Sequence, residues 1–270
     1  MKREAAATLV WTRSRRDWDE DQKLFQDRES SFCTLHLPCL SFTAVKRERQ
    51  FSQVDQLLSK GAPLLVVFTS AWGVHYAWEN PYLRSHLTHA SIYALGEGTS
   101  QALQQYGLAG RHPKIPRGGL ELGQLIVKST RGDEVVLLPG GVERAFDLRL
   151  YLSEHGLTAV TIDLYQSIAA IDKSGPGLPQ VVETLRERLQ QPGHPLLLCF
   201  ASPTAVIGFY RGFAPLLRQE TARAPGASSI ALALGETTAQ CCRQYFERVV
   251  LAPKPTLRAL LAHAELLAQR

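Results

Sequence analysis

The chain contains 270 residues, 45% of them hydrophobic, and its 30 Lys and Arg residues against 25 Asp and Glu residues give a net charge of +5. This length is sufficient for one large domain, or for two domains of ordinary size, with real hydrophobic cores. No apolar run approaches the roughly 18 to 20 residues that a membrane span needs, so we expect no membrane association, no signal peptide and a cytoplasmic location. The positive charge favours an anionic ligand, but the basic residues are scattered among acidic ones, which argues against nucleic-acid binding.

Short runs rich in Val, Leu and Ile alternate along the chain with segments of helical periodicity. The runs lack a clean alternation of apolar and polar residues, as is typical of strands buried on both faces of a parallel sheet. In chain order, strands are expected at residues 8–13, 33–39, 64–70, 91–96, 134–140, 157–165, 196–202, 229–235 and 248–253. The pattern predicts an α/β protein with mostly parallel sheets.

Two phrases occur twice in the chain. IYALGEGTSQALQQYG begins at residue 92 and IALALGETTAQCCRQYF at residue 230, and their shared Ala-Leu-Gly-Glu core recurs after 235 − 96 = 139 residues. VVFTSAWGVHYAW likewise aligns with LLCFASPTAVIGFY, which pairs Ser70 with Ser202. LVWTR precedes a helix and LHLPCLSF, just as VVLLPGG precedes a helix and VTIDLYQSI. The sequence predicts an internal duplication, and it leaves open whether the copies fold separately or exchange elements.

Four turns from strand to helix, two in each copy, carry Gly, Ser or Thr. They contain Ser70, Gly96 with Thr99, Ser202, and Gly235 with Thr237 and Thr238. The first N–H groups of a helix have no partner within the helix, so such turns can bind a carboxylate or phosphate. Parallel sheets bind ligands at this end of their strands. A Ser or Thr at one helix start is more simply explained as a cap, and the repetition is what favours binding.

Neither metal nor cofactor chemistry has support in the sequence. His86 and His89 are spaced like a pair of ligands, but no third ligand stands near them, and two surface histidines are the simpler interpretation. The five cysteines show no Cys-x-x-Cys spacing, and we expect them to be reduced and buried. There is no nucleotide-binding glycine motif and no catalytic triad. We therefore expect no metal and no cofactor.

Tyr165 is the one polar aromatic residue that invites a functional interpretation. It ends the expected strand VTIDLY and precedes the stretch SGPGLP. A strand running between two domains would place its hydroxyl near a cleft, whereas an ordinary half-buried tyrosine fits the sequence equally well.

The order of these phrases resembles that of the uroporphyrinogen-III synthase family, whose members close a linear tetrapyrrole without a cofactor. The matching phrases span nearly the whole chain in the right order, and they are WTR, FTSAWGV, YALGEGTSQAL, GLTAVTIDLYQS, FASPTAV, ALGETTAQ and APKPTLRALLAHA. The chain departs from the family pattern in two places. Ala71-Trp72 stands where the family often has Pro-Arg, and Pro139-Gly140-Gly141 stands where it often has Arg-Gly.

The resemblance implies two flavodoxin-like α/β domains with elements exchanged between the repeats. The first domain would contain residues 1–38 and 168–270, and the second residues 43–163. Residues 39–42 and 164–167 would be the two linker strands.

The resemblance also implies the function of a monomeric synthase that converts hydroxymethylbilane, inverts its last ring through a spiro intermediate and releases water. A cleft lined by helix starts suits the carboxylates of this substrate, and the enzyme's main task would be orientation. Tyr165 would assist departure of the hydroxyl. The residues expected to bind the substrate are Thr12, Arg13, Ser70, Gly96, Thr99, Gly140, Ser202, Thr237 and Thr238. The competing class is a protein of two domains that binds a small anion without catalysis, and a flavodoxin-like regulator is a weaker third choice.

Overall fold

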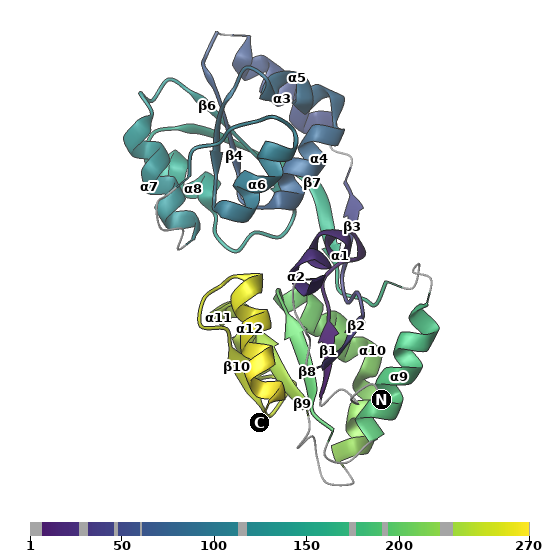
Figure 1. Cartoon of the computed structure of the whole chain (residues 1–270). Helices are drawn as coiled ribbons and strands as arrows, with labels where there is room; N and C mark the ends of the chain where they lie inside the picture. The colour runs from purple at the N-terminus through teal and green to yellow at the C-terminus, as the bar shows by residue number, and fades with distance from the viewer. Residues whose placement is uncertain are drawn as a thin grey trace. The chain divides into compact units, whose positions relative to one another are not determined.

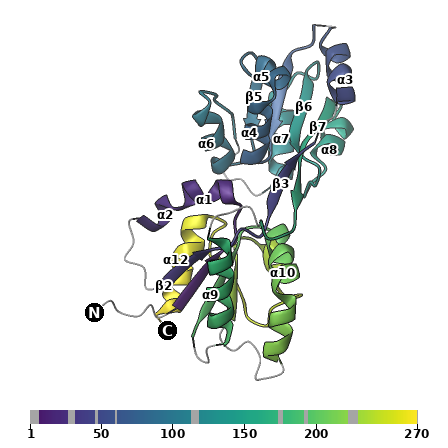
Figure 2. The same cartoon turned by 90° about the vertical axis from the view of Figure 1, so that its right-hand side faces the viewer.

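The computed structural model describes residues 7–26, 32–45, 48–59, 61–112, 118–172, 177–190, 194–221 and 229–269. The chain forms two compact units: unit 1 is Met1–Ser41 with Ile168–Arg270, and unit 2 is Phe42–Ser167. Each unit contains one sheet of five strands with helices on both of its faces (Figures 1 and 2). The prediction of an α/β fold with two mostly parallel sheets is confirmed.

Unit 1 has the strand order β10-β9-β8-β1-β2, with every neighbouring pair parallel. Its strands are β1 (Ala7–Trp11), β2 (Phe32–His36), β8 (Leu196–Phe200), β9 (Ser229–Ala233) and β10 (Val249–Leu251). Its helices are α1 (Arg15–Asp21), α2 (Lys23–Gln26), α9 (Leu178–Gln190), α10 (Pro203–Thr221), α11 (Glu236–Cys242) and α12 (Leu257–Ala268). The last part of the stretch SGPGLP leads into α9, and its residues 174–176 lie outside the described part of the chain.

Unit 2 has the strand order β3-β7-β6-β4-β5. Its strands are β3 (Ser41–Ala44), β4 (Leu64–Phe68), β5 (Ser91–Ala94), β6 (Val135–Gly141) and β7 (Thr158–Ile168). Its helices are α3 (Glu48–Leu58), α4 (Ala71–Glu79), α5 (Pro81–Leu87), α6 (Glu97–Gln105), α7 (Gly119–Ser129) and α8 (Leu148–Glu154). The pairs β7-β6, β6-β4 and β4-β5 are parallel.

The nine strands expected from the sequence all have counterparts in the two sheets. The sequence did not predict β3, whose residues Ser41–Ala44 are half-buried or exposed and carry no apolar run. It lies beside β7, which runs without interruption to Ile168. The chain segments expected to act as linkers therefore include residues of sheet strands.

The two sheets show how the duplicated copies are distributed. The first copy supplies β1 and β2 to unit 1 and β4 and β5 to unit 2, whereas the second supplies β6 and β7 to unit 2 and β8 and β9 to unit 1. The order β2-β1-β8-β9 in one sheet corresponds to β7-β6-β4-β5 in the other. The elements are therefore exchanged between the repeats, as the resemblance implied.

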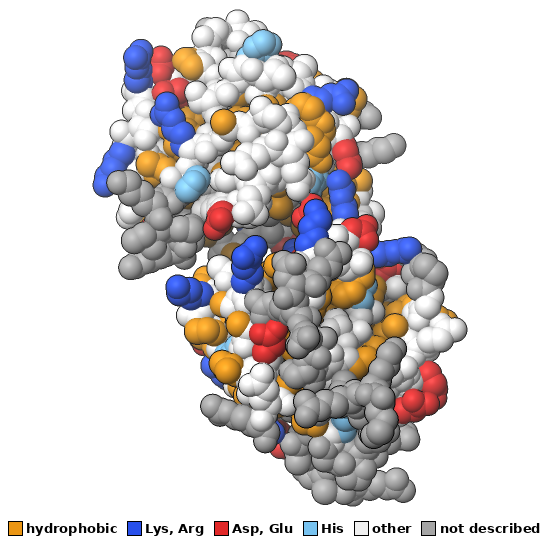
Figure 3. All heavy atoms as spheres, viewed as in Figure 1, with side chains coloured by type: hydrophobic (Ala, Val, Ile, Leu, Met, Phe, Trp, Pro, Cys, Tyr) orange, Lys and Arg blue, Asp and Glu red, His pale blue; other side chains and the backbone are white. Residues whose placement is uncertain are grey.

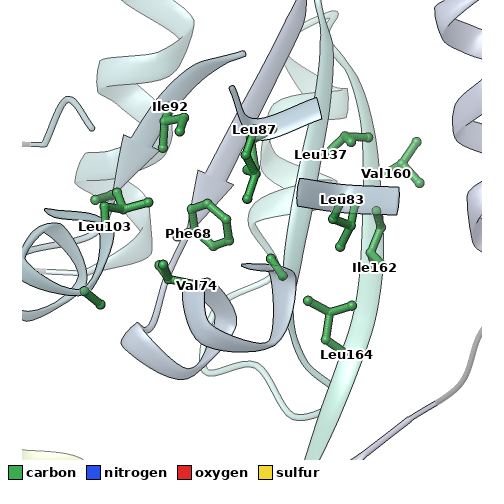
Figure 4. Packing of buried hydrophobic residues seen from close by; sticks show 14 of the residues in the cluster. Phe68, Val74, Leu83, Leu87, Ile92, Leu103, Leu137, Val160, Ile162 and Leu164 are labelled. Atoms are coloured by element: carbon green, nitrogen blue, oxygen red, sulfur yellow. The ribbon is translucent and has the colours of Figure 1, made fainter. Parts of the chain in front are cut away.

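The core of unit 2 is divided between the two faces of its sheet. Val66, Phe68 and Leu137 point to the face covered by α4, α5 and α6, whereas Leu65 and Val136 point to the face covered by α7 and α8. Figure 4 shows the first of these clusters, with Phe68 among side chains of the neighbouring strands and helices. Burial on both faces explains why these strands read as continuous apolar runs.

Unit 1 is built in the same way. Leu9 and Leu197 belong to the cluster under α12, and Phe200 contacts Phe209 of α10, with ring centroids 5.7 Å apart. Figure 1 shows α9 and α10 on the other side of this sheet from α12.

Charged side chains of both signs are interspersed on the face of the molecule in Figure 3. Among the residues that the structure describes on this face, Lys and Arg form no continuous basic stripe. No helix in the described part of the chain is both long and apolar enough to cross a membrane.

Candidate functional site

Tyr165 lies near the end of β7 in unit 2 and is buried, with 8% of the residue exposed. Its hydroxyl oxygen lies 2.9 Å from the Oγ of Ser70, which follows β4. Because β6 stands between β7 and β4 in the sheet, the tyrosine side chain must pass over the end of β6 to reach Ser70. The structure thus brings together two residues that the sequence proposed separately.

The end of β6 leaves room for this tyrosine because it carries two glycines. The pairing of β6 with β7 shifts between Gly140 and Gly141, and Gly141 stands opposite Tyr165. A Cβ atom at Gly141 would lie 2.9 Å from Cε2 and 3.1 Å from Cζ of Tyr165, closer than Cβ atoms normally come to other atoms. Gly141, which was not among the residues expected at the site, is therefore the glycine against which the ring of Tyr165 packs.

Ser70 is the N-cap of α4, and its Oγ accepts a hydrogen bond of 3.0 Å from the N–H of Gly73. The expected cap is confirmed here, and it fixes the Oγ atom beside the tyrosine. A Cβ at Gly73 would lie 3.0 Å from the carbonyl oxygen of Pro139 and 3.3 Å from Ser70 Oγ. The glycine of the FTSAWGV phrase therefore allows α4 to start close to β6.

Aromatic side chains enclose the ring of Tyr165. Tyr76 of α4 stacks on it with centroids 5.1 Å apart, and Phe42 of β3 meets it edge-on at 5.5 Å. Trp72 packs on Phe42 at 4.1 Å. Trp72 belongs to the pair Ala71-Trp72, which departs from the family pattern. Here it contributes apolar surface next to the tyrosine.

The surroundings of Tyr165 keep its hydroxyl protonated. Burial raises the pKa of Tyr165 above its usual value, and this effect outweighs the opposing effects of the hydrogen bond with Ser70, of the positive charge of Arg144 and of the Gly141 backbone. Arg144 forms an ion pair with Asp163 at 2.8 Å. A neutral hydroxyl can donate a proton at physiological pH, which is the protonation state that an acid catalyst requires.

The doubled Gly-Glu phrases have equivalent positions in the two units. Gly96 and Gly235 are the N-caps of α6 and α11, and neither helix has a side-chain cap. Our expectation that threonines cap these helices is wrong, because the glycine occupies the capping position and the threonines lie inside the first turn. Thr99 and Thr238 are buried, whereas Thr237 is exposed.

Ser202 of the second copy and Thr12 of the WTR phrase both lie in unit 1. The Oγ of Ser202 accepts from the N–H of Ala205 at 3.3 Å, as a cap of α10. The Thr12 hydroxyl is fully buried and donates to the carbonyl oxygen of Cys199 at 2.7 Å. Thr12 therefore serves the packing of β1 against β8.

Arg13 is held by two carboxylates of α1. It pairs with Asp17 at 3.0 Å and with the buried Asp21, which also accepts a hydrogen bond of 2.8 Å from the Trp11 ring nitrogen. Burial raises the pKa of Asp21 to about 6, against the opposing charge of Arg13. The acidic run after Arg13 was the signal in the sequence for this internal pairing.

The expected site residues fall into two sets. Unit 2 contains Ser70, Gly96, Thr99, Gly140 and Tyr165, and unit 1 contains Thr12, Arg13, Ser202, Thr237 and Thr238. A Cβ at Gly140 would meet nothing within 4 Å, so this glycine leaves open space. Among the described residues, no group of three or more His, Cys, Asp or Glu side chains is arranged to hold a metal ion. All five cysteines are free; Cys39, Cys199 and Cys242 are buried, and the other two are half-buried.

Comparisons with known proteins agree with the resemblance. The family model described as uroporphyrinogen-III synthase HemD matches residues 22–262. The structure of uroporphyrinogen-III synthetase from Helicobacter pylori is similar, with a TM-score of 0.61 and 20% identity over 98% of this chain and 100% of that chain. A mutant uroporphyrinogen III synthase from the extremely thermophilic bacterium Thermus thermophilus gives a TM-score of 0.55 and 21% identity over 97% and 99%. No curated protein matches at a significant level. At these identities the solved structures support the fold, and the family model supports the family.

Proposed function

The chain belongs to the uroporphyrinogen-III synthase family, and we propose that it cyclises hydroxymethylbilane to uroporphyrinogen III in haem biosynthesis. The reaction is that of a cyclising lyase: it inverts the last ring through a spiro intermediate and releases water. The match of the family model over residues 22–262 is the observation that carries this conclusion.

Tyr165 is our candidate for the residue that assists departure of the terminal hydroxyl. Its own hydroxyl is protonated, hydrogen-bonded to Ser70 and fixed between aromatic rings. The pyrrole nitrogen supplies the electron pair that expels the hydroxyl, so a positioned weak acid is sufficient help. The larger demand on the enzyme is to hold the conformer in which the ring closes at its substituted carbon, which is an effect of orientation.

The carboxylates of the substrate are proposed to bind at the starts of the helices in both units. Ser70 and Ser202 precede α4 and α10, where backbone N–H groups and the helix dipole favour an anion. Gly96 with Thr99, and Gly235 with Thr237 and Thr238, are proposed for the same role because the phrase is repeated in both units. Thr237 is the exposed hydroxyl among them. Gly140 is proposed to leave space for the substrate, since no atom lies where its side chain would be. Thr12 and Arg13 are proposed to act indirectly, by shaping the end of β1.

We further propose domain limits of 1–38 with 168–270 and of 43–163, with residues 39–42 and 164–167 as the connections. The division of the chain into compact units near Ser41 and Ser167 supports these limits. We also propose that the protein acts as a monomer in the cytoplasm, without a cofactor.

The test is an incubation of the purified protein with hydroxymethylbilane, followed by oxidation and separation of the porphyrin isomers. Hydroxymethylbilane closes unaided to the symmetric isomer, so the asymmetric type III isomer is the expected product and a direct measure of catalysis. Formation of the symmetric isomer alone, at the rate seen without protein, would contradict the proposal and favour binding without catalysis.

A further inference from the structure

The hydroxyl groups of Ser70 and Tyr165 contain two hydrogens, and the contact between them uses only one. Each hydroxyl has one hydrogen to donate and can also accept hydrogen bonds. The contact of 2.9 Å consumes one hydrogen, whichever residue is the donor. The Ser70 oxygen also accepts from the backbone N–H group of Gly73. The pair therefore keeps one hydrogen for a partner outside itself.

The position of this spare hydrogen depends on the direction of the bond between the two residues. If Tyr165 donates to Ser70, the hydrogen of Ser70 is available, and reversal of the bond makes the hydrogen of Tyr165 available instead. In either arrangement the outer hydroxyl accepts from its neighbour, and Ser70 accepts from the N–H group of Gly73 as well. Such chains polarise the outer O–H group and strengthen it as a donor.

We propose that Ser70 and Tyr165 form one proton-donating unit, in which either oxygen can deliver the spare hydrogen to the hydroxyl that leaves the substrate. This inference rests on the proposed function, and it makes Ser70 a second catalytic residue in addition to its role as a helix cap. It also gives the N–H group of Gly73 a catalytic purpose, because this group holds the oxygen of Ser70.

The proton balance of the step closes without any further reactant. The bond between the substrate's methylene carbon and its oxygen breaks, the oxygen keeps the electron pair and takes the hydrogen, and water departs. The lone pair of the pyrrole nitrogen forms the new π bond. The negative charge left on the unit is stabilised by the N–H group of Gly73, which donates to Ser70. The attacking ring closes first at its substituted carbon, which carries no hydrogen, so the spiro intermediate forms as a cation. The bond from this carbon to its original methylene group then breaks, and the free α-carbon of the same ring attacks that methylene carbon. This α-carbon loses its hydrogen as a proton, which restores the unit.

Two donors with separate anchors can replace each other. In Tyr165→Phe, Ser70 still accepts from Gly73 and can still donate. In Ser70→Ala, Phe42 and Tyr76 still hold the ring of Tyr165, and its hydroxyl can still donate. Only the double variant lacks a donor. The two substitutions should therefore affect kcat far more together than the separate effects predict.

The experiment is a cycle of four proteins: wild type, Tyr165→Phe, Ser70→Ala and the double variant. The rate measured is that of type III isomer formation at saturating substrate. We expect kcat to fall less than about tenfold in each single variant and about 10²- to 10⁴-fold in the double variant, the range of an acid-base contribution. We also expect a normal solvent isotope effect on kcat in the wild type and both single variants, and its loss in the double variant, which a purely structural role would not produce.

Two further variants separate proton donation from helix capping. Asn80 caps α5 by accepting from the N–H of Leu83 at 3.2 Å, so Ser70→Asn can cap α4 without a hydroxyl. Combined with Tyr165→Phe, Ser70→Asn should lower kcat as much as Ser70→Ala does in the same background. Ser70→Thr, which keeps a hydroxyl, should preserve the rate of the Tyr165→Phe variant. Ser70→Asn also replaces Ser70→Ala in the cycle if the alanine variant does not fold. Thr256→Ala, which removes the exposed cap of α12, serves as the control for a lost cap.

The outcomes distinguish this inference from the proposed function. A wild-type protein that forms no type III isomer overturns both. In an active protein, a loss in the double variant equal to the product of the two single losses indicates independent contributions. A loss equal to that of the more affected single variant indicates one donor and one supporting residue. Either of these two results overturns the shared unit and leaves the synthase function intact.

Discussion

The close packing of Tyr165 against β6 can be tested by adding one methyl group at Gly141. In Gly141→Ala the new Cβ would lie 2.9 Å from Cε2, 3.1 Å from Cζ and 3.3 Å from the hydroxyl oxygen of Tyr165. Ordinary contacts of this kind are 3.4 to 4 Å long, so the ring has to retreat by several tenths of an ångström. Phe42 and Tyr76 pack against the same ring and oppose this movement.

Insertion of a methyl group into such a packed position costs about 1–3 kcal/mol. For a unit of this size, that corresponds to a fall in melting temperature of about 4 to 12 °C. The retreat also lengthens the contact of 2.9 Å between Tyr165 and Ser70, so kcat for the type III isomer should fall as well. Calorimetry of the unit 2 transition and the isomer assay measure the two effects.

The neighbouring glycine is a matched control for stability. A Cβ at Gly140 meets nothing within 4 Å, so Gly140→Ala should change the unfolding free energy by less than about 0.5 kcal/mol. If Gly141→Ala and Gly140→Ala melt at the same temperature as the wild type, the close approach of Tyr165 to β6 is wrong.

Three other outcomes follow from the structure. Because the Asp21 carboxyl holds its proton to about pH 6 in the folded protein and to about pH 4 in the unfolded chain, the unfolding free energy should fall as pH rises between these values. Denaturant titrations across this range should show that slope, and Asp21→Asn should remove it. Burial raises the thiol pKa of Cys39 and Cys199, so both should resist alkylation at pH 8 until the protein is unfolded, and rapid native labelling of either would contradict their burial. Thr237→Ala should raise KM less than about tenfold with kcat unchanged, since the backbone N–H groups of α11 remain; a large fall in kcat would contradict a binding role.

Most of the fold could be predicted from the sequence because its strands are buried on both faces. Runs such as LLVVF and LLLCF are continuously apolar, as is typical of strands buried on both faces of a parallel sheet. β3 was missed because its burial is partial and its pairing depends on β7, which is far away in the sequence. The exchange of elements came from the resemblance, since the duplication by itself allows two arrangements.

Single residues of the site could be predicted from the sequence, but the contact between them could not. Ser70 and Tyr165 each have a local signal, a serine at a helix start and a tyrosine at a strand end. Their contact depends on the order β7-β6-β4 and on Gly141, which no local pattern specifies. Arg13 stays a prediction from a family phrase, and the structure adds that Asp17 and Asp21 engage its side chain.

The register of the sheets indicates why unit 2, and not unit 1, came to hold the hydroxyl pair. Leu64 pairs with Val135, and its repeat counterpart Leu196 pairs with Thr8, so Thr8 corresponds to Val135. β1 ends at Trp11, whereas β6 continues to Gly141. Counting six residues on from Thr8 and from Val135 aligns Ser14, which follows β1, with Gly141 at the end of β6.

In unit 1 this position carries a side chain with a structural task, since Ser14 accepts from the N–H of Asp17 and begins α1. In unit 2 the same position is a glycine, and any side chain there would meet the ring of Tyr165. Both copies retain the capping serine after the next strand, Ser70 in one and Ser202 in the other. The absence of a side chain at Gly141 therefore allows Tyr165, from the adjacent strand, to reach the capping serine Ser70. The contact of the two hydroxyls is what makes this helix start a candidate proton donor.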